Sequence, residues 1–107
     1  MENYKRKLIT LCASRSTNLP YFYVDVEHNS RHFVARCVVE SNVKVTSYAK
    51  CESAREAEQI ACKRMLESLE FLAIEDPSGT RPLFITEEAC MNYEESGSNM
   101  ISISKLV

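Results

Sequence analysis

The clearest element in the chain is the stretch SAREAEQIACKRMLESLEFL at residues 53–72, which predicts a long amphipathic helix. Its opening letters fit a capping box, in which the hydroxyl of Ser53 accepts a hydrogen bond from the backbone N–H of Glu56 and the Glu56 side chain reaches back. Apolar side chains then recur at helical spacing, at Ala57, Ile60, Ala61, Met65, Leu66 and Leu69. Because two of these residues are small alanines, we expect the helix backbone to approach a sheet closely.

Three short strands are predicted ahead of this helix, at residues 21–26, 32–40 and 43–50. They are rich in aromatic and β-branched side chains, and in the first two the side chains alternate between two faces. The polar turns between the strands are short. Short turns favour an antiparallel meander, since parallel pairing needs a long crossover connection.

A first helix is predicted at residues 2–14, before the strands. Tyr4, Leu8, Leu11 and Cys12 form one apolar stripe, and the helix has to end before Pro20. The resulting order of elements is α-β-β-β-α. We therefore expect an α+β fold in which a three-stranded antiparallel sheet carries two helices on one face.

The C-terminal part of the sequence has a weaker pattern. The letters DPSG at residues 76–79 predict a turn and a boundary, so we divide the chain into a domain at residues 1–72 and an acidic extension at residues 73–107. Within the extension, short strands are predicted at residues 82–86 and 101–105, and Thr86 is placed to cap a helix at residues 87–94. Two alternatives stay open, an extension that is partly ordered or packs on the domain and a tail that is mobile throughout.

Composition excludes several classes of protein. The 107 residues are 45% apolar and 26% charged, which is typical of globular domains, and no apolar run approaches the roughly 20 residues of a membrane span. The first residues lack the apolar stretch of a signal peptide, so the expected location is the nucleus, the cytoplasm or both. The net charge is +2 over residues 1–70 and −4 over residues 71–107, so a mildly basic part precedes an acidic one.

No catalytic or metal site is predicted from the sequence. The five cysteines form no CxxC pair, and His28 and His32 have no cysteine close to them, so we expect neither a zinc site nor a disulfide framework. The two glycines, Gly79 and Gly97, cannot form a glycine-rich phosphate loop. We therefore expect a non-catalytic protein that holds no cofactor.

The order of the elements and the residues of both helices resemble the double-stranded RNA-binding domain over about residues 3–70. In the first helix, the Y-K, L, L-C, R and L-P run of plant members is matched by Tyr4, Lys5, Leu8, Leu11, Cys12, Arg15, Leu19 and Pro20. In the last helix, the family's A-x-x-x-A-A-x-x-A-L-x-x-L pattern is similar to Ala57, Ala61, Cys62, Met65, Leu66 and Leu69. Phe33 with its alternating neighbours looks like the family's second strand.

This resemblance implies that double-stranded RNA is the partner and that the domain contacts the RNA at three places. In the family, the first helix enters one minor groove, the loop between the first two strands enters the next, and the last helix begins over the intervening phosphates. The contacts would then come from Lys5, Thr10, His28, Arg31, Lys50 and Arg55. The resemblance also implies a role in small-RNA or RNA-processing pathways, beside a Dicer-like or another double-stranded RNA-binding protein.

The sequence departs from the family at the phosphate site. The family has S-K-K-x-A-K at the start of the last helix, whereas residues 53–58 read SAREAE, so about two positive charges are lost and Glu58 is added. The loop between the first two strands is also shorter and lacks the family's G-P-x-H signature. Because affinity grows with the number of neutralised phosphates, we expect RNA binding weakened by an order of magnitude or more.

A second hypothesis is a protein-pairing module on the same fold, as a homodimer or heterodimer with weak or no RNA binding. Tyr21, Tyr23, Val34 and Val38 fall on the sheet face away from the helices, so the tail or a partner should cover them. They form the candidate interface together with Val45, and residues 43–50 would offer an exposed edge for strand addition. A third hypothesis, a fragment of an RNase III-type nuclease, is disfavoured because the acidic metal-binding helix is missing.

Overall fold

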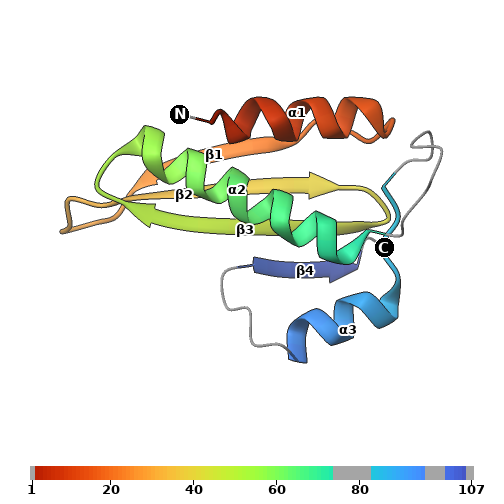
Figure 1. Cartoon of the computed structure of the whole chain (residues 1–107). Coiled ribbons are helices and arrows are strands. Elements are labelled where there is room, and N and C mark those ends of the chain that lie inside the picture. The colour runs from red at the N-terminus through yellow and green to blue at the C-terminus, as the bar shows by residue number, and fades with distance from the viewer. Residues whose placement is uncertain (1, 74–82, 96–100, 106–107) are drawn as a thin grey trace.

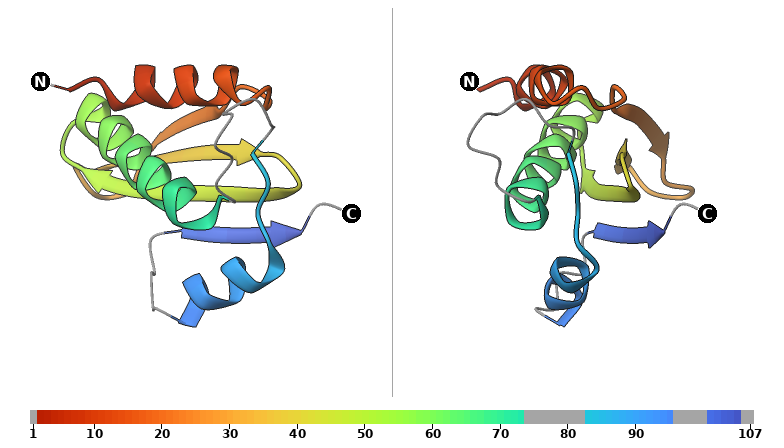
Figure 2. Two further views of the ribbon diagram at one scale, coloured as in Figure 1. Left: turned by 45° about the vertical axis from the view of Figure 1, so that its right-hand side comes forward. Right: turned by 90° about the vertical axis from the view of Figure 1, so that its right-hand side faces the viewer.

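A computed structural model describes residues 2–73, 83–95 and 101–105 (Figure 1). Its elements are α1 (Tyr4–Ser14), β1 (Tyr21–Val26), β2 (Phe33–Glu40), β3 (Val43–Cys51), α2 (Ala54–Leu72), α3 (Glu87–Glu95) and β4 (Ile101–Lys105). The predicted α-β-β-β-α order is confirmed, and a fourth strand joins the sheet. As predicted, α1 and α2 cover the same face of the sheet (Figure 2).

Both long helices begin directly after a residue whose side chain caps them. Asn3 Oδ1 accepts a hydrogen bond from the N–H of Arg6 at 3.0 Å, so α1 begins at Tyr4 rather than at residue 2. Ser53 Oγ accepts from the N–H of Glu56 at 3.4 Å, which confirms the predicted cap of α2. Each cap satisfies a backbone donor that the helix itself leaves unpaired.

The core lies between the sheet and α2. The strands are neighbours in the order β1-β2-β3-β4, and every neighbouring pair is antiparallel. The close approach expected from Ala57 and Ala61 is confirmed, because both are buried and the hydroxyl of Ser47 on β3 donates to the carbonyl of Ala61 at 2.7 Å. The position of α2 is therefore tied to the register of β3.

The extension packs against both layers. Thr86 Oγ1 accepts from the N–H of Ala89 at 3.1 Å and so caps α3, which lies beside α2 (Figure 1). The Tyr93 hydroxyl is 3.0 Å from the Ser68 hydroxyl on α2, and the Tyr93 ring contacts Phe71. Ahead of α3, the main core gains Leu83 and Ile85.

The predictions for the extension are confirmed in part. The helix and the strand at residues 101–105 are present, and the helix ends at Glu95. The strand predicted at residues 82–86 is wrong over residues 83–86, where Ile85 forms only an isolated bridge with Ala73. The predicted turn at residues 76–79 lies outside the described residues, as does Pro82. Residues 83–95 and 101–105 contain segments that pack on the domain, which favours the first of the two alternatives for the extension.

Pairing of β4 with β3 changes the predicted protein interface. β4 pairs with residues 43–47 of β3, so the exposed edge predicted at residues 43–50 is wrong over those five residues. Val45 is 0% exposed and belongs to the core beneath the helices, so it cannot contact a partner as predicted. Val38 lies on the opposite face, yet it is only 6% exposed. Within the described residues, the outer strands of the sheet are β1 and β4.

Candidate nucleic-acid interface

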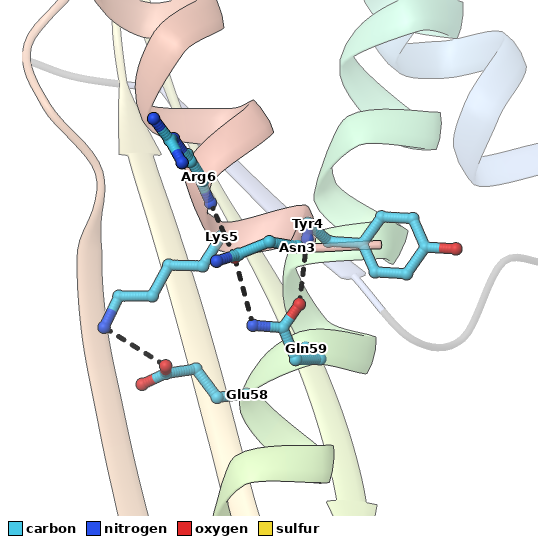
Figure 3. A network of polar contacts seen from close by, with 6 residues as sticks. All are labelled: Asn3, Tyr4, Lys5, Arg6, Glu58 and Gln59. Carbon is cyan, nitrogen blue, oxygen red and sulfur yellow. Dashed lines mark hydrogen bonds and ion pairs between the residues drawn. The ribbon is translucent and has the colours of Figure 1, made fainter. Parts of the chain in front are cut away.

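The three segments predicted to contact RNA lie toward the same end of the molecule. The start of α1, the loop between β1 and β2 and the start of α2 all lie at the left in Figure 1. The N–H of Tyr4 donates to Gln59 Oε1 at 2.8 Å, and Gln59 Nε2 donates to Asn3 Oδ1 at 3.4 Å (Figure 3). One glutamine in the second turn of α2 therefore holds the start of α1 in place.

Lys5 takes part in this network and is only partly available to a ligand. Its Nζ lies 3.1 Å from Glu58 Oε1 on α2 (Figure 3). The same Nζ lies 4.7 Å from the centre of the Phe22 ring on β1. Glu58 stands where the sequence departs from the family pattern. The acidic residue thus adds a negative charge to the surface and also neutralises the nearest predicted lysine.

The outer side of α1 presents its polar side chains to solvent. The Arg6 side chain points away from the Gln59 network (Figure 3), and among the described residues it forms no ion pair. It lines a shallow hollow together with Thr10, which is exposed as predicted. Arg6 is therefore an additional candidate contact, and its spacing of four residues from Thr10 is the sequence signal that identifies it.

The loop between β1 and β2 is a tight turn organised by Ser30. The Ser30 hydroxyl accepts from the N–H of His32 at 2.9 Å and donates to Glu27 Oε2 at 3.3 Å. Asn29 has a left-handed φ of 62°, a conformation that asparagine tolerates better than most residues. These contacts leave His28 and Arg31 exposed, as predicted for contact residues.

Lys50 also has an acidic partner. Its Nζ lies 2.5 Å from Glu27 Oε2, and the hydrogen bond from Lys50 is the main cause that lowers the pKa of Glu27 below its ordinary value. Both side chains are largely exposed, so the pair is weakened by solvent and salt. A phosphate can therefore compete with Glu27 for Lys50.

Arg55 is the predicted cation best placed for a phosphate. It is exposed in the first turn of α2, and no ion pair within the described residues involves it. The unpaired N–H groups and the positive end of the dipole at this helix start also attract anions. Glu52 and Glu56 are exposed close by in the sequence and oppose that attraction.

The open face of the sheet is the second predicted surface. Tyr21 and Tyr23 are 48% and 47% exposed, so no described part of the extension covers them. The guanidinium of Arg36 lies 5.0 Å from the centre of the Tyr23 ring and 3.8 Å from Asp25 Oδ2. Val34 is half-buried on the same face. The exposed part of the predicted interface is therefore concentrated on β1.

The thiols lie in the core rather than in a reactive site. Cys12, Cys37 and Cys62 are buried, and burial raises the pKa of Cys12 to about 11. The neighbouring Cys62 and burial together raise the pKa of Cys37. The raised pKa values make Cys12 and Cys37 poor nucleophiles and poor metal ligands, whereas the hydrogen bond with Cys37 lowers the pKa of Cys62. Among the described residues, no cluster of three metal-ligating side chains occurs, and no helix is long and apolar enough to cross a bilayer.

A comparison with known protein families matches the segments that form the candidate interface. The family model of the double-stranded RNA binding motif matches residues 4–69, which is more than half of the chain. The match begins at the first residue of α1, reaches the last turn of α2 and leaves out α3 and β4. A search among curated proteins gave no match, and a search among solved structures gave none either. The chain therefore belongs to the family of proteins that carry the double-stranded RNA binding motif.

Proposed function

We propose that this chain binds double-stranded RNA without catalysis, recognising the backbone and the A-form shape with the start of α1, the β1–β2 loop and the start of α2. The observation that supports this most strongly is that the three segments lie toward the same end of the molecule (Figure 1). Gln59 links two of them. A surface built in this way can follow one side of a duplex from one minor groove to the next.

The proposed contacts fall into two groups. The exposed group, without an ion pair among the described residues, consists of Arg6, Thr10, His28, Arg31 and Arg55. Lys5 and Lys50 reach a phosphate only by leaving Glu58 and Glu27. Each such exchange frees a carboxylate beside the RNA, so the gain from counterion release is partly offset. Binding is therefore weaker than in a chain whose lysines are free at these positions.

The test is a titration of a duplex RNA of about 20 base pairs, followed by fluorescence anisotropy at several salt concentrations. Arg55→Glu should weaken binding about tenfold or more, because it removes one charge-assisted contact and adds repulsion. Lys44→Glu is the matched control, since Lys44 is exposed at the opposite end of β3. Absence of binding at low salt, or equal effects of the two variants, would contradict the proposal.

The cellular role is also proposed from the family resemblance. We propose that the chain acts in the nucleus or cytoplasm beside a Dicer-like or another double-stranded RNA-binding protein, in small-RNA production or other RNA processing. The plant-like run at the start of the sequence supports this role. Adding the purified chain to a Dicer-like nuclease should change the rate or position of duplex cleavage. An unchanged cleavage pattern at saturating RNA occupancy would contradict it.

Protein pairing is the second candidate function. The exposure of Tyr21 and Tyr23 favours it, because binding would remove the apolar surface of both rings from water. The candidate interface now lies on β1, since β4 pairs with residues 43–47 of β3. Tyr23→Asp should then abolish pairing, as measured by light scattering, and an unchanged particle mass would count against this face.

A further inference from the structure

β1 is an outer strand of the sheet, and its free edge is exposed (Figure 2). Four of its six residues are exposed large apolar residues, namely Tyr21, Tyr23, Val24 and Val26. The tyrosines lie on the open face and the valines on the helix face, so the edge is apolar on both sides. Edges are usually protected by lysine, proline or a bulge. The strand YFYVDV contains neither lysine nor proline, its one charged residue is Asp25, and its register with β2 has no break.

Alternate residues of β1 direct their backbone polar groups out of the sheet. The N–H of Glu27 donates to the carbonyl of His32 at 2.9 Å, which continues the ladder between β1 and β2. In an antiparallel ladder, bonded positions alternate with positions that are not bonded to the partner. The outward N–H and C=O groups of β1 are therefore those of Phe22, Val24 and Val26.

We propose that β1 pairs antiparallel with β1 of a second copy of this chain, about a twofold axis at Val24, so that two sheets join into one. In this register Val24 faces Val24 of the second copy, and Phe22 faces its Val26 in both directions. Every outward N–H and C=O group of β1 then has a partner. A register centred on Tyr23 would instead place Pro20, which has no N–H, opposite Val26 and lose hydrogen bonds.

The side chains are complementary in the same register. On the open face, Tyr23 lies beside Asp25 of the second copy, and the Arg36 guanidinium already lies over the Tyr23 ring. Asp25 has a side chain that is 73% exposed and a 3.8 Å contact to Arg36 of its own chain, so it can accept a second donor. Two carboxylates and two guanidiniums then alternate across the junction. On the other face, Val24 meets Val24 of the second copy, and Val26 meets its Phe22. This match of charge and apolar surface selects a second copy as the partner.

This pairing rests on the protein-pairing candidate and names its partner and register, and it does not depend on the proposed RNA binding. None of the residues proposed to contact RNA belongs to β1. The experiment is therefore done on the full chain without RNA, by sedimentation equilibrium over a range of protein concentrations. We expect an equilibrium between monomer and dimer.

Three variants test the edge. Val24→Pro should give a monomer that remains folded, because the N–H it removes points outward and is not bonded to β2. Val26→Lys should also give a monomer, because a lysine at the junction has to be desolvated. The matched control is Met91→Lys, which makes the same kind of change at an exposed apolar residue of α3 and should leave the dimer intact. Circular dichroism melting identifies any variant that has lost the fold.

The outcomes separate the proposal from its alternatives. A chain that stays monomeric up to its highest soluble concentration overturns it. A dimer that survives both Val24→Pro and Val26→Lys also overturns it, because the contact then lies elsewhere. Dissociation by both edge variants together with an intact Met91→Lys dimer supports it.

Hydrogen exchange gives a second readout at the level of single amides. The outward N–H groups of Phe22, Val24 and Val26 should exchange slowly only at concentrations where the dimer forms. The N–H groups of Tyr23 and Asp25 bond to β2 and should be protected in monomer and dimer alike. This alternation along one strand is specific to edge pairing. Rapid exchange of the outward amides in a populated dimer would place the interface outside β1.

Discussion

At the scale of single residues, carboxylates govern the candidate RNA surface as much as the cations do. Glu58 holds Lys5 at 3.1 Å, and Glu27 holds Lys50. The positions of all four residues can be read from the sequence. Their pairing cannot, because Lys5 and Glu58 come from different helices and meet only through the placement of α1 on α2. Arg55, in contrast, was predictable as a contact candidate, because its exposure at the start of α2 does not depend on a partner from another element.

Replacing the acid that holds Lys5 should strengthen RNA binding. In Glu58→Gln, Lys5 loses its ion pair and the surface loses one negative charge, so we expect duplex affinity to rise several-fold at low salt. The free energy of unfolding should change by less than about 1 kcal/mol, because the pair is only partly buried and solvent still screens it. Anisotropy titration measures the affinity, and Glu67→Gln, at an exposed acid farther along α2, is the control. Equal affinities for the two variants would refute a role for the Lys5 pair.

The buried Cys12 thiol should make the fold less stable in alkali. Its pKa is about 11 in the folded chain against an ordinary 9.0, so between these values the thiol ionises in the unfolded chain only. The contribution of this thiol to the free energy of unfolding is therefore fully present below pH 9. It falls by about 2–3 kcal/mol as the pH rises toward 11.

Urea unfolding at pH 8 and at pH 10.5 measures this effect. Cys12→Ala should lose less free energy between the two pH values than the unaltered chain does, because it has no thiol to ionise. An identical loss in both proteins would show that Cys12 does not contribute.

At the scale of elements, α2 positions the rest of the fold. Its start was predictable from local chemistry alone, because the Ser53 cap and the apolar spacing lie within one stretch of sequence. β4 was predictable as a strand but not as the neighbour of β3. Strand type depends on local pattern, whereas the choice of partner depends on which edge remains free after the rest of the chain has packed. The strand expected at residues 82–86 also depends on finding a partner strand. Leu83 and Ile85 are buried in the core, but the pairing there consists of one isolated bridge.

Enlarging the contact between α2 and β3 should destabilise the domain. Ala61→Leu adds volume where the Ser47 hydroxyl donates to the Ala61 carbonyl at 2.7 Å, so α2 has to move away from the sheet. We expect a loss of about 1–3 kcal/mol in the free energy of unfolding, measured with urea. Ala13→Leu, at an exposed alanine of α1, should have little effect. Similar losses in both variants would contradict the close packing at Ala61.

At the scale of the whole molecule, the extension changes which side of the sheet is open. β4 covers one edge of the meander, and α3 packs beside α2 through Tyr93 and Ser68. The family match ends at residue 69, so this closure is an addition to the matched motif. β1 therefore remains as the apolar edge of the sheet. The sequence pattern could not predict this, because it did not indicate which strand β4 pairs with.

Detaching β4 should reopen the edge of β3. Ile103→Asp places a charge where Ile103 packs against the core, and it should lower the melting temperature by several degrees. In a Val24→Pro background, which blocks β1, the same change should restore self-association through β3, as seen by light scattering. Ser104→Asp is the control, because Ser104 is exposed on the opposite face of β4. A chain that stays monomeric and equally stable with Ile103→Asp would contradict this role of β4.

The pairing of β3 with β4 also has a consequence for the order in which the chain folds. β2 and β3 are joined by a hairpin, whereas β4 pairs with residues 43–47 of β3 from residues 101–105 at the far end of the sequence. Contacts between neighbouring segments form faster than contacts that close a long loop. The three-stranded meander should therefore exist for a time with β3 unpaired, and during that interval a foreign strand competes with β4 for the same backbone groups. Slow refolding at high protein concentration, and its relief by dilution, would be the kinetic signature of that competition.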